Sequence, residues 1–229
     1  MEYLPPANRV QAGDLDETTI SAEGKHVIII GGGDTGADCL GTAHRQGAAS
    51  VHQFEIMPRP PEIRSERTPW PTFPLVYKVT SAHEEGGERM FSVNTTEFTG
   101  EDGVVKKLHG NEVESRIIDG RPTFVPVDNS EFELDADLVL LAMGFTGPEQ
   151  GGLLTDLGVD LDQRGNVVRT KQWATSVSNV FACVDMGRGQ SLIVWAIAEG
   201  RSCAAAIDKQ LMGETLLPSP VKPTDRPLI

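Results

Sequence analysis

The feature that most constrains this chain is an apolar run of β-branched residues followed at once by closely spaced glycines. Residues 25–30 read Lys-His-Val-Ile-Ile-Ile, and residues 31–36 read Gly-Gly-Gly-Asp-Thr-Gly. Such a run is typical of a strand buried on both faces of a parallel sheet. A helix is predicted from Asp34 to Gln46, and a second strand from Ser50 to Ile56. The segment therefore predicts a strand–helix–strand unit with glycines in its first turn.

The glycines match the G-x-G-x-x-G pattern of dinucleotide-binding turns. Gly31 permits the tight turn out of the strand, Gly33 lets the backbone approach a pyrophosphate, and Gly36 lets helix and strand pack closely. The phosphates would then lie on the free N–H groups at the start of the helix. The hexapeptide alone is a weak signal, but a strand before it and a helix after it are the context that the pattern requires. The alternative is a glycine-rich turn that binds no ligand.

The residues after the second strand leave the choice of dinucleotide open. Glu55 is the candidate acid for a ribose 2′-hydroxyl, which favours NAD. Just beyond it, Arg59 and Arg64 are candidates to pair with a 2′-phosphate, which favours NADP. The alternative for both arginines is a solvated loop.

A second feature lies near the C-terminus, where a short strand is predicted over Asn179–Val184 and a helix over Gly189–Leu211. Asp185 follows the strand and is a candidate to accept hydrogen bonds from hydroxyl groups. The N–H groups near Gln190 and Ser191 are candidates to donate to a carbonyl or a phosphate. The alternative is that Asp185 is a simple helix cap.

The remaining segments favour an α/β fold with added antiparallel strands. Six prolines in residues 58–74 predict a long surface loop. Another apolar strand is predicted over Leu138–Ala142. Short strands typical of an antiparallel meander are predicted over Met90–Phe98, Val104–Leu108, Val113–Ile118 and Thr123–Val127.

Composition excludes several classes of protein. The 229 residues include 20 Lys plus Arg and 33 Asp plus Glu, a net charge of −13, which argues against binding nucleic acid or an anionic membrane. We find no signal peptide, and no apolar run approaches the roughly 20 residues of a membrane span, so a cytoplasmic protein is expected. Cys39, Cys183 and Cys203 are widely spaced, and no metal or iron–sulfur site is expected in this chain.

Several motifs together resemble the small (beta) subunit family of NADPH-dependent glutamate synthases, over nearly the whole chain. The glycine motif alone is shared by many flavin oxidoreductases, and the last motif, Arg188 to Arg201, is the most specific. The matching stretches are Gly31–Cys39, Arg45–Ala48, Met57–Pro61, Ala136–Leu138 through Gly144-Phe145, and Arg188–Leu192 through Trp195–Arg201.

The resemblance implies a Rossmann-like NADPH-binding domain inserted into an FAD-binding domain that is split in sequence. It implies residues 1–23 as a connector or partial FAD-domain segment, residues 24–145 as the NADPH-binding domain, and residues 146–229 as the C-terminal part of the FAD-binding domain with an extended tail. By matching motif, it implies three groups of contacts: Gly31, Gly33, Asp34, Thr35 and Gly36 at the NADPH pyrophosphate; Arg45, Arg59 and Arg64 at the adenosine phosphate; and Asp185, Gln190 and Ser191 at the flavin.

The implied activity is hydride transfer from NADPH to FAD, feeding electrons to glutamate synthesis from glutamine and 2-oxoglutarate. No side chain is expected as acid or base, because the cofactors carry the chemistry. The chain departs from the family at Cys183-Val184-Asp185, where Ala-Gly-Asp is usual, and at Gly187, where a basic residue is usual.

The chain resembles only the C-terminal half of that subunit. The family's iron–sulfur ligands and first G-x-G-x-x-G belong to the half that is absent here. The expected partners are therefore the glutamate synthase large (alpha) subunit or an N-terminal half that supplies the rest of the FAD site. The alternative is a stand-alone NADP-binding or interaction module that is not catalytic by itself.

Overall fold

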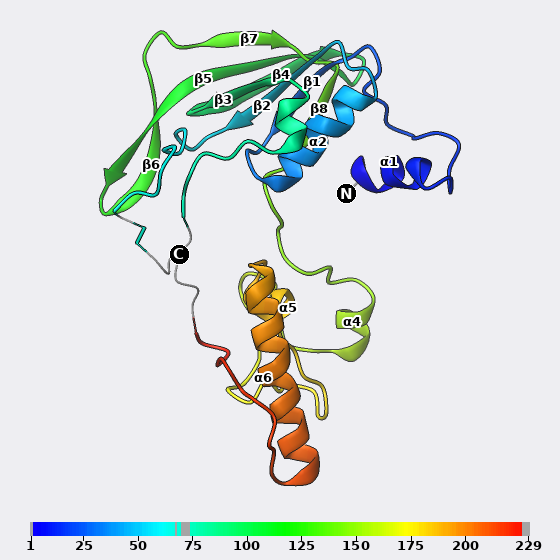
Figure 1. Cartoon of the computed structure of the whole chain (residues 1–229), viewed down its shortest axis with the longest axis vertical. Helices are drawn as coiled ribbons and strands as arrows, with labels where there is room; N and C mark the ends of the chain where they lie inside the picture. Colours follow the sequence, from blue (N-terminus) through cyan, green and yellow to red (C-terminus); the bar gives the residue numbers. More distant parts are fainter. Residues whose placement is uncertain (1, 67, 70–73, 226–229) are drawn as a thin grey trace. The chain divides into compact units, whose positions relative to one another are not determined.

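The computed structural model describes residues 2–66, 68–69 and 74–225, and it divides the chain into two compact units (Figure 1). The first unit comprises residues 1–144 and the second residues 145–229. The predicted loop over residues 58–74 lies partly outside the described residues. Where it is described, it forms neither helix nor strand.

The first unit is built on a four-stranded parallel sheet with the strand order β3-β2-β1-β8. Its strands are β1 (His26–Ile30), β2 (Ser50–Glu55), β3 (Glu88–Phe91) and β8 (Leu138–Leu141). In β1, Val27, Ile28 and Ile29 are fully buried. The two faces of this central strand contact different layers, which is why its apolar residues run on without alternation.

Helices pack on one face of this sheet, as Figure 1 shows. They are α1 (Leu4–Gln11), α2 (Asp34–Arg45) and α3 (Ser81–Glu84). Leu40 and Ala43 of α2 pack with Val27 and Ile29 in one apolar cluster, and their side chains are fully buried. α2 confirms the predicted helix, and Gly47 follows it in the left-handed conformation that ends helices.

The segment before β1, residues 1–23, was expected as a connector or partial FAD-domain segment, and it contains α1. Pro5 and Pro6 lie in its first turn, where a missing N–H removes no intrahelical hydrogen bond. The segment is tied to the first unit: the Gln46 Oε1 atom accepts hydrogen bonds from the Tyr3 hydroxyl at 2.9 Å and from the Ala22 N–H at 2.8 Å.

An antiparallel sheet covers the other face through a cluster that joins Ile28 and Phe54 to Val93 and Leu108. This sheet confirms the predicted antiparallel strands, but their bounds differ. The predicted strand over Met90–Phe98 divides between β3 of the parallel sheet and β4, and two predicted strands form one long β5. The strands of this antiparallel sheet are β4 (Val93–Glu101), β5 (Val104–Ile118), β6 (Arg121–Pro126) and β7 (Phe132–Asp135). The sequence reading missed β7.

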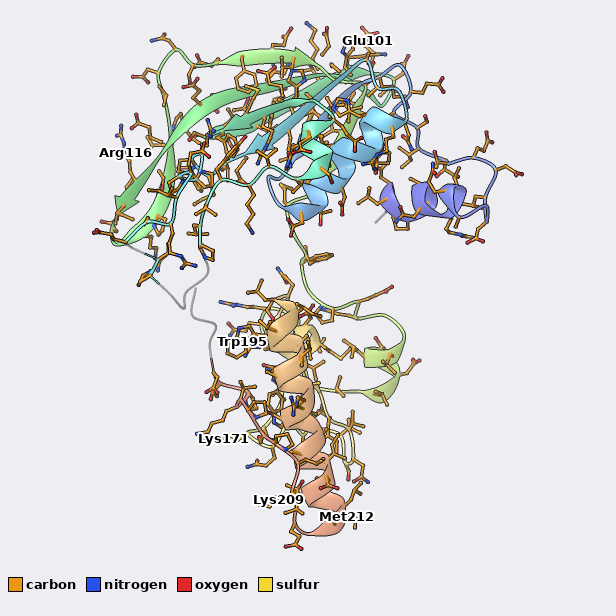
Figure 2. The ribbon with its side chains drawn as sticks, in the orientation of Figure 1. Glu101, Arg116, Lys171, Trp195, Lys209 and Met212 are labelled. Atoms are coloured by element: carbon orange, nitrogen blue, oxygen red, sulfur yellow. The ribbon has the colours of Figure 1, made fainter. Side chains whose placement is uncertain are left out.

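The second unit has little regular sheet. It contains α4 (Leu153–Leu157), α5 (Asp185–Arg188) and α6 (Ile193–Met212), around a small cluster that includes Leu154, Val167 and Ala182. Figure 2 shows Trp195 near the start of α6 and Lys209 and Met212 near its end.

Two predictions for the second unit were wrong in detail. The strand predicted over residues 179–184 is a single bridge between Phe181 and Ala174. The helix predicted from Gly189 begins at Ile193, so Gln190 and Ser191 precede it rather than open it. Gly189 has a φ of +83°, which is not helical and therefore separates α5 from α6.

Candidate nucleotide-binding sites

The glycine turn lies where β1 leads into α2, at the carboxyl edge of the parallel sheet. β2 lies on one side of β1 and β8 on the other, so the strand order reverses at this point. In open α/β sheets such a switch point is where ligands bind. A cavity of about 820 Å³ opens here, and it is lined by residues 30–35, 54–56, 93–95, 98 and 141–144.

Two of the glycines are required by the protein itself. Gly31 has a φ of +130°, and a Cβ atom there would lie 2.2 Å from the Ala142 carbonyl oxygen. A Cβ atom on Gly36 would lie 2.1 Å from the Gly31 carbonyl oxygen. These contacts let α2 begin directly against β1 and β8, as expected for the first and third glycines of the pattern.

Gly33 differs, because nothing in the protein requires it to be glycine. A Cβ atom there would meet no atom within 4 Å, and its φ of −83° and ψ of −174° suit any residue. It lines the cavity and precedes α2, whose first N–H groups have no partner within the helix. The missing side chain thus leaves room for a group outside the protein.

The acid at the end of β2 faces the glycine turn. The Glu55 carboxylate accepts the Gly32 N–H at 3.1 Å and the Met57 N–H at 2.9 Å. Gln53, which is buried, donates its amide N–H to the Gly31 carbonyl at 3.0 Å and binds the His83 ring at the same distance. These contacts hold the turn in place from the strand beside it.

Arg59, a predicted site residue, lies near Arg89, which was not predicted from the sequence. The guanidinium carbon of Arg59 lies 4.1 Å from the centroid of the Tyr77 ring, and that of Arg89 lies 4.7 Å from the same centroid. Arg89 belongs to β3, and its partner across the ladder is Gln53 of β2. Only this parallel pairing brings position 89 to the end of β2, so no local motif points to it.

The other two candidate arginines lie differently. Arg64 donates to the Thr68 carbonyl at 2.8 Å within the loop after β2. Arg45 lies in the last turn of α2 and forms an ion pair with Glu85. A helix of this length places Arg45 about 17 Å from the glycine turn. Arg45 thus lies at the far end of α2 from the glycine turn, and its assignment to the adenosine phosphate stays a prediction.

In the second unit, two of the three candidate flavin residues lie together. Asp185 and Gln190 line a cavity of about 560 Å³, together with Met186 and residues 145, 147–149, 151 and 153–154. The Gln190 amide donates to the Phe145 carbonyl at 3.2 Å, and Asp185 is exposed at the start of α5. Ser191 is exposed and does not line this cavity.

A buried carboxylate that was given no role in the sequence reading organises the second unit. Glu199 of α6 is fully buried, and Arg169 donates to both of its oxygens, at 2.7 and 3.1 Å. The Val184 N–H donates to it at 2.6 Å, and Arg188 completes the cluster. Burial raises the pKa of Glu199, but the hydrogen bonds from Arg169, Val184 and Arg188 outweigh this and hold the pKa below its ordinary value.

Val184 holds a conformation that favours glycine. Its φ is +64° and its ψ is −146°, and a β-branched side chain is strained there. The Glu199 bond to its N–H, together with the turn into α5, keeps it in place.

Replacing Val184 with glycine is therefore expected to stabilise the second unit. The relieved strain, about 1–3 kcal/mol, exceeds the added freedom of glycine in the unfolded chain, about 1 kcal/mol. Urea unfolding of wild type and Val184→Gly measures the difference. A matched change at Val177, a partly buried valine with no positive φ, should destabilise instead.

Comparison with known sequences bears on both sites. The sequence pattern of the family described as pyridine nucleotide-disulphide oxidoreductase matches residues 2–200. The chain belongs to this family. The flavoprotein oxidoreductase resemblance is thus confirmed.

The chain is also similar to curated glutamate synthase small chains. The small chain of glutamate synthase [NADPH] from Mycobacterium tuberculosis (strain ATCC 25618 / H37Rv) is 66% identical over 233 residues, covering 100% of this chain and 47% of that protein. The corresponding chain from Bacillus subtilis (strain 168) is 40% identical, covering 95% and 46%. The chain thus spans about half the length of these relatives.

The structural comparison supports the same fold. A crystal structure of T. acidophilum thioredoxin reductase matches with a TM-score of 0.55 and 22% identity, over 83% of this chain and 54% of that one. In residues 2–66, 68–69 and 74–225, no helix is long and apolar enough to cross a bilayer. The same described part of the chain contains no group of three or more His, Cys, Asp or Glu placed to hold a metal ion.

Proposed function

We propose that the first unit binds NADPH with the pyrophosphate on the glycine turn. The observation that carries this is Gly33, which lines the cavity and where a larger side chain would meet no atom of the protein. The N–H groups of Gly33, Asp34 and Thr35 begin α2 and supply positive ends of peptide dipoles. The backbone of Asp34, rather than its carboxylate, serves the phosphates.

The 2′-phosphate is assigned to Arg59 and Arg89. Two guanidinium groups on the Tyr77 ring bring two positive charges close together, an arrangement that a shared anion stabilises. Arg59 also pairs with Glu62 at 2.6 Å, but the pair is exposed and easily exchanged for a doubly charged phosphate. Arg64, in the same loop, remains a further candidate.

We expect Arg59→Ala to weaken NADPH binding by about tenfold to a hundredfold, since a hydrogen bond to a charged group contributes about 1.5–3 kcal/mol. NADH lacks the 2′-phosphate, so its affinity should change little. Isothermal titration with both nucleotides gives the ratio, and Arg89→Ala should act in the same way. Arg116→Ala, at an exposed arginine that pairs with Glu114, is the matched control, and an equal loss for NADH and NADPH would contradict the assignment.

The second unit is proposed to bind part of FAD. Asp185 and Gln190 would hold the ribityl chain and the ring edge at the mouth of the 560 Å³ cavity, with Ser191 a further candidate beside them. When bound, NADPH supplies a hydride and FAD accepts it. The protein groups orient the two cofactors, and no side chain is required as acid or base.

The rest of the FAD site is proposed to come from an N-terminal half, with the large (alpha) subunit of glutamate synthase as the electron-accepting partner through iron–sulfur clusters outside this chain. Ile193, Val194 and Ile197 at the start of α6 are each more than half exposed, which suits a face covered by more protein. The product of the whole assembly would be glutamate, formed from glutamine and 2-oxoglutarate.

Flavin absorbance near 450 nm tests the oxidoreductase role directly. The purified chain, with FAD added, is expected to hold flavin that bleaches when NADPH is added without oxygen. A colourless protein that still binds NADPH would instead support the second candidate, an NADP-binding module that is not catalytic by itself. That candidate is favoured by one observation, the coverage of only 47% of the Mycobacterium tuberculosis relative.

A further inference from the structure

Two cysteines that are far apart in sequence meet in the second unit. Cys183 directly precedes Val184, whose N–H donates to Glu199 of α6 at 2.6 Å. Cys203 is one helical turn beyond Glu199 and therefore lies on the same face of α6. The Cys183 thiol lies near enough to the Cys203 thiol to raise its pKa.

The two thiols differ in access. Cys203 is 5% exposed, whereas Cys183 is half-buried, and both are free cysteines. The pKa of Cys203 is raised to about 12, first by burial and then by Cys183 and Glu199, which together outweigh the lowering by Arg169. Cys183 is thus the thiol that an oxidant reaches first, and Cys203 is positioned to react with it afterwards.

We propose that Cys183 and Cys203 form a reversible redox site whose oxidant is hydrogen peroxide and whose reductant is a thiol. The Cys183 sulfur attacks one oxygen of hydrogen peroxide, the O–O bond breaks, and the other oxygen takes the thiol proton and leaves as water, which gives a sulfenic acid. The Cys203 sulfur then displaces the sulfenic hydroxyl as a second water, and an S–S bond forms. The two thiols together lose two electrons, and one hydrogen peroxide is reduced to two waters.

The disulfide would tie the segment before α5 to α6. Asp185 lies two residues beyond Cys183, so oxidation restrains the chain beside the proposed flavin residue. Neither cysteine lines the 560 Å³ cavity, and the chemistry needs no cofactor. The redox site therefore stands or falls independently of the proposed NADPH and FAD binding.

Peptide mapping of the native 229-residue chain tests this site. Trypsin places Cys183 in residues 172–188 and Cys203 in residues 202–209, so the disulfide appears as two linked peptides. After equimolar hydrogen peroxide and blocking of free thiols, we expect the linked pair, with a loss of two hydrogen atoms, and its disappearance on adding dithiothreitol. Cys39, buried in α2, is the internal control and should remain a thiol in residues 26–45.

Two variants make the result specific. Cys183→Ala should leave Cys203 reduced under the same treatment, because the accessible thiol is gone. Cys203→Ala should instead accumulate sulfinic acid on Cys183, because the resolving thiol is gone. Sulfinic acid on Cys183 of the wild type, a disulfide between two chains, or two reduced cysteines at a peroxide dose that oxidises the urea-unfolded chain would each overturn the proposal.

Discussion

Replacing Gly33 with valine is expected to abolish NADPH binding while the chain stays folded. The side chain would project into the cavity where the pyrophosphate is proposed to lie, and nothing in the protein opposes it. Overpacking of this kind costs about 3 kcal/mol when neither side can move, which corresponds to a loss of about a hundredfold or more. Isothermal titration with NADPH measures the loss, and circular dichroism checks the fold.

Other glycines supply the controls for this test. Gly200 of α6 also has open space around its Cα and no positive φ, so Gly200→Val should leave NADPH affinity unchanged. Gly31→Val should fail differently, by unfolding the first unit, because its side chain would meet the Ala142 carbonyl. Wild-type affinity in Gly33→Val would show that the phosphates do not lie on this turn.

Replacing Glu199 with alanine is expected to destabilise the second unit by about 3–5 kcal/mol. The change leaves the guanidinium groups of Arg169 and Arg188, whose side chains are only 6% and 10% exposed, without their shared carboxylate. It also leaves the Val184 N–H without an acceptor. Urea unfolding followed by the fluorescence of Trp173 and Trp195, in a Trp70→Phe background, reports on this unit.

Exposed ion pairs should contribute much less to the stability of the chain. Arg116 and Glu114 are both more than half exposed, so Glu114→Gln should change stability by no more than about 1 kcal/mol. An equally small effect of Glu199→Ala would contradict the organising role of the buried cluster.

The pH dependence of stability provides a second test of the contribution of the Glu199 carboxylate. The pKa of Glu199 is lower in the folded chain than its ordinary value, so its contribution to stability is complete above that ordinary value. The contribution is lost as the pH falls through the lowered pKa, because the carboxylate must then take up a proton. Glu199→Gln has no such proton to bind. Wild type and Glu199→Gln should therefore differ less at low pH than at neutral pH.

The glycine turn could be predicted because each of its requirements is local. Gly31, Gly33 and Gly36 are adjacent in sequence to the strand and the helix that they join, and the spacing alone implies a distinct role for each. The same locality allowed β8 to be predicted from its unbroken apolar run, although β8 is an edge strand and its Leu141 is exposed.

Prediction failed where position in the fold outweighed local pattern. No helix was predicted over residues 4–11, yet α1 forms there because Pro5 and Pro6 lie in its first turn, which tolerates proline. Met90 and Val93 appeared to belong to one strand, yet Ser92, with a φ of +57°, separates two strands in different sheets.

The sequence by itself determined the strand–glycine–helix unit and the fold class, because these depend on residues close together along the chain. Only the tertiary structure decided which charged groups meet. Arg89 lies beside Gln53 because β3 pairs with β2 in parallel. Glu199 forms ion pairs with Arg169 and Arg188, which come from separate segments. The physical reason is that burial and ion pairing depend on distance in space, and no spacing in the sequence records the distances that folding creates.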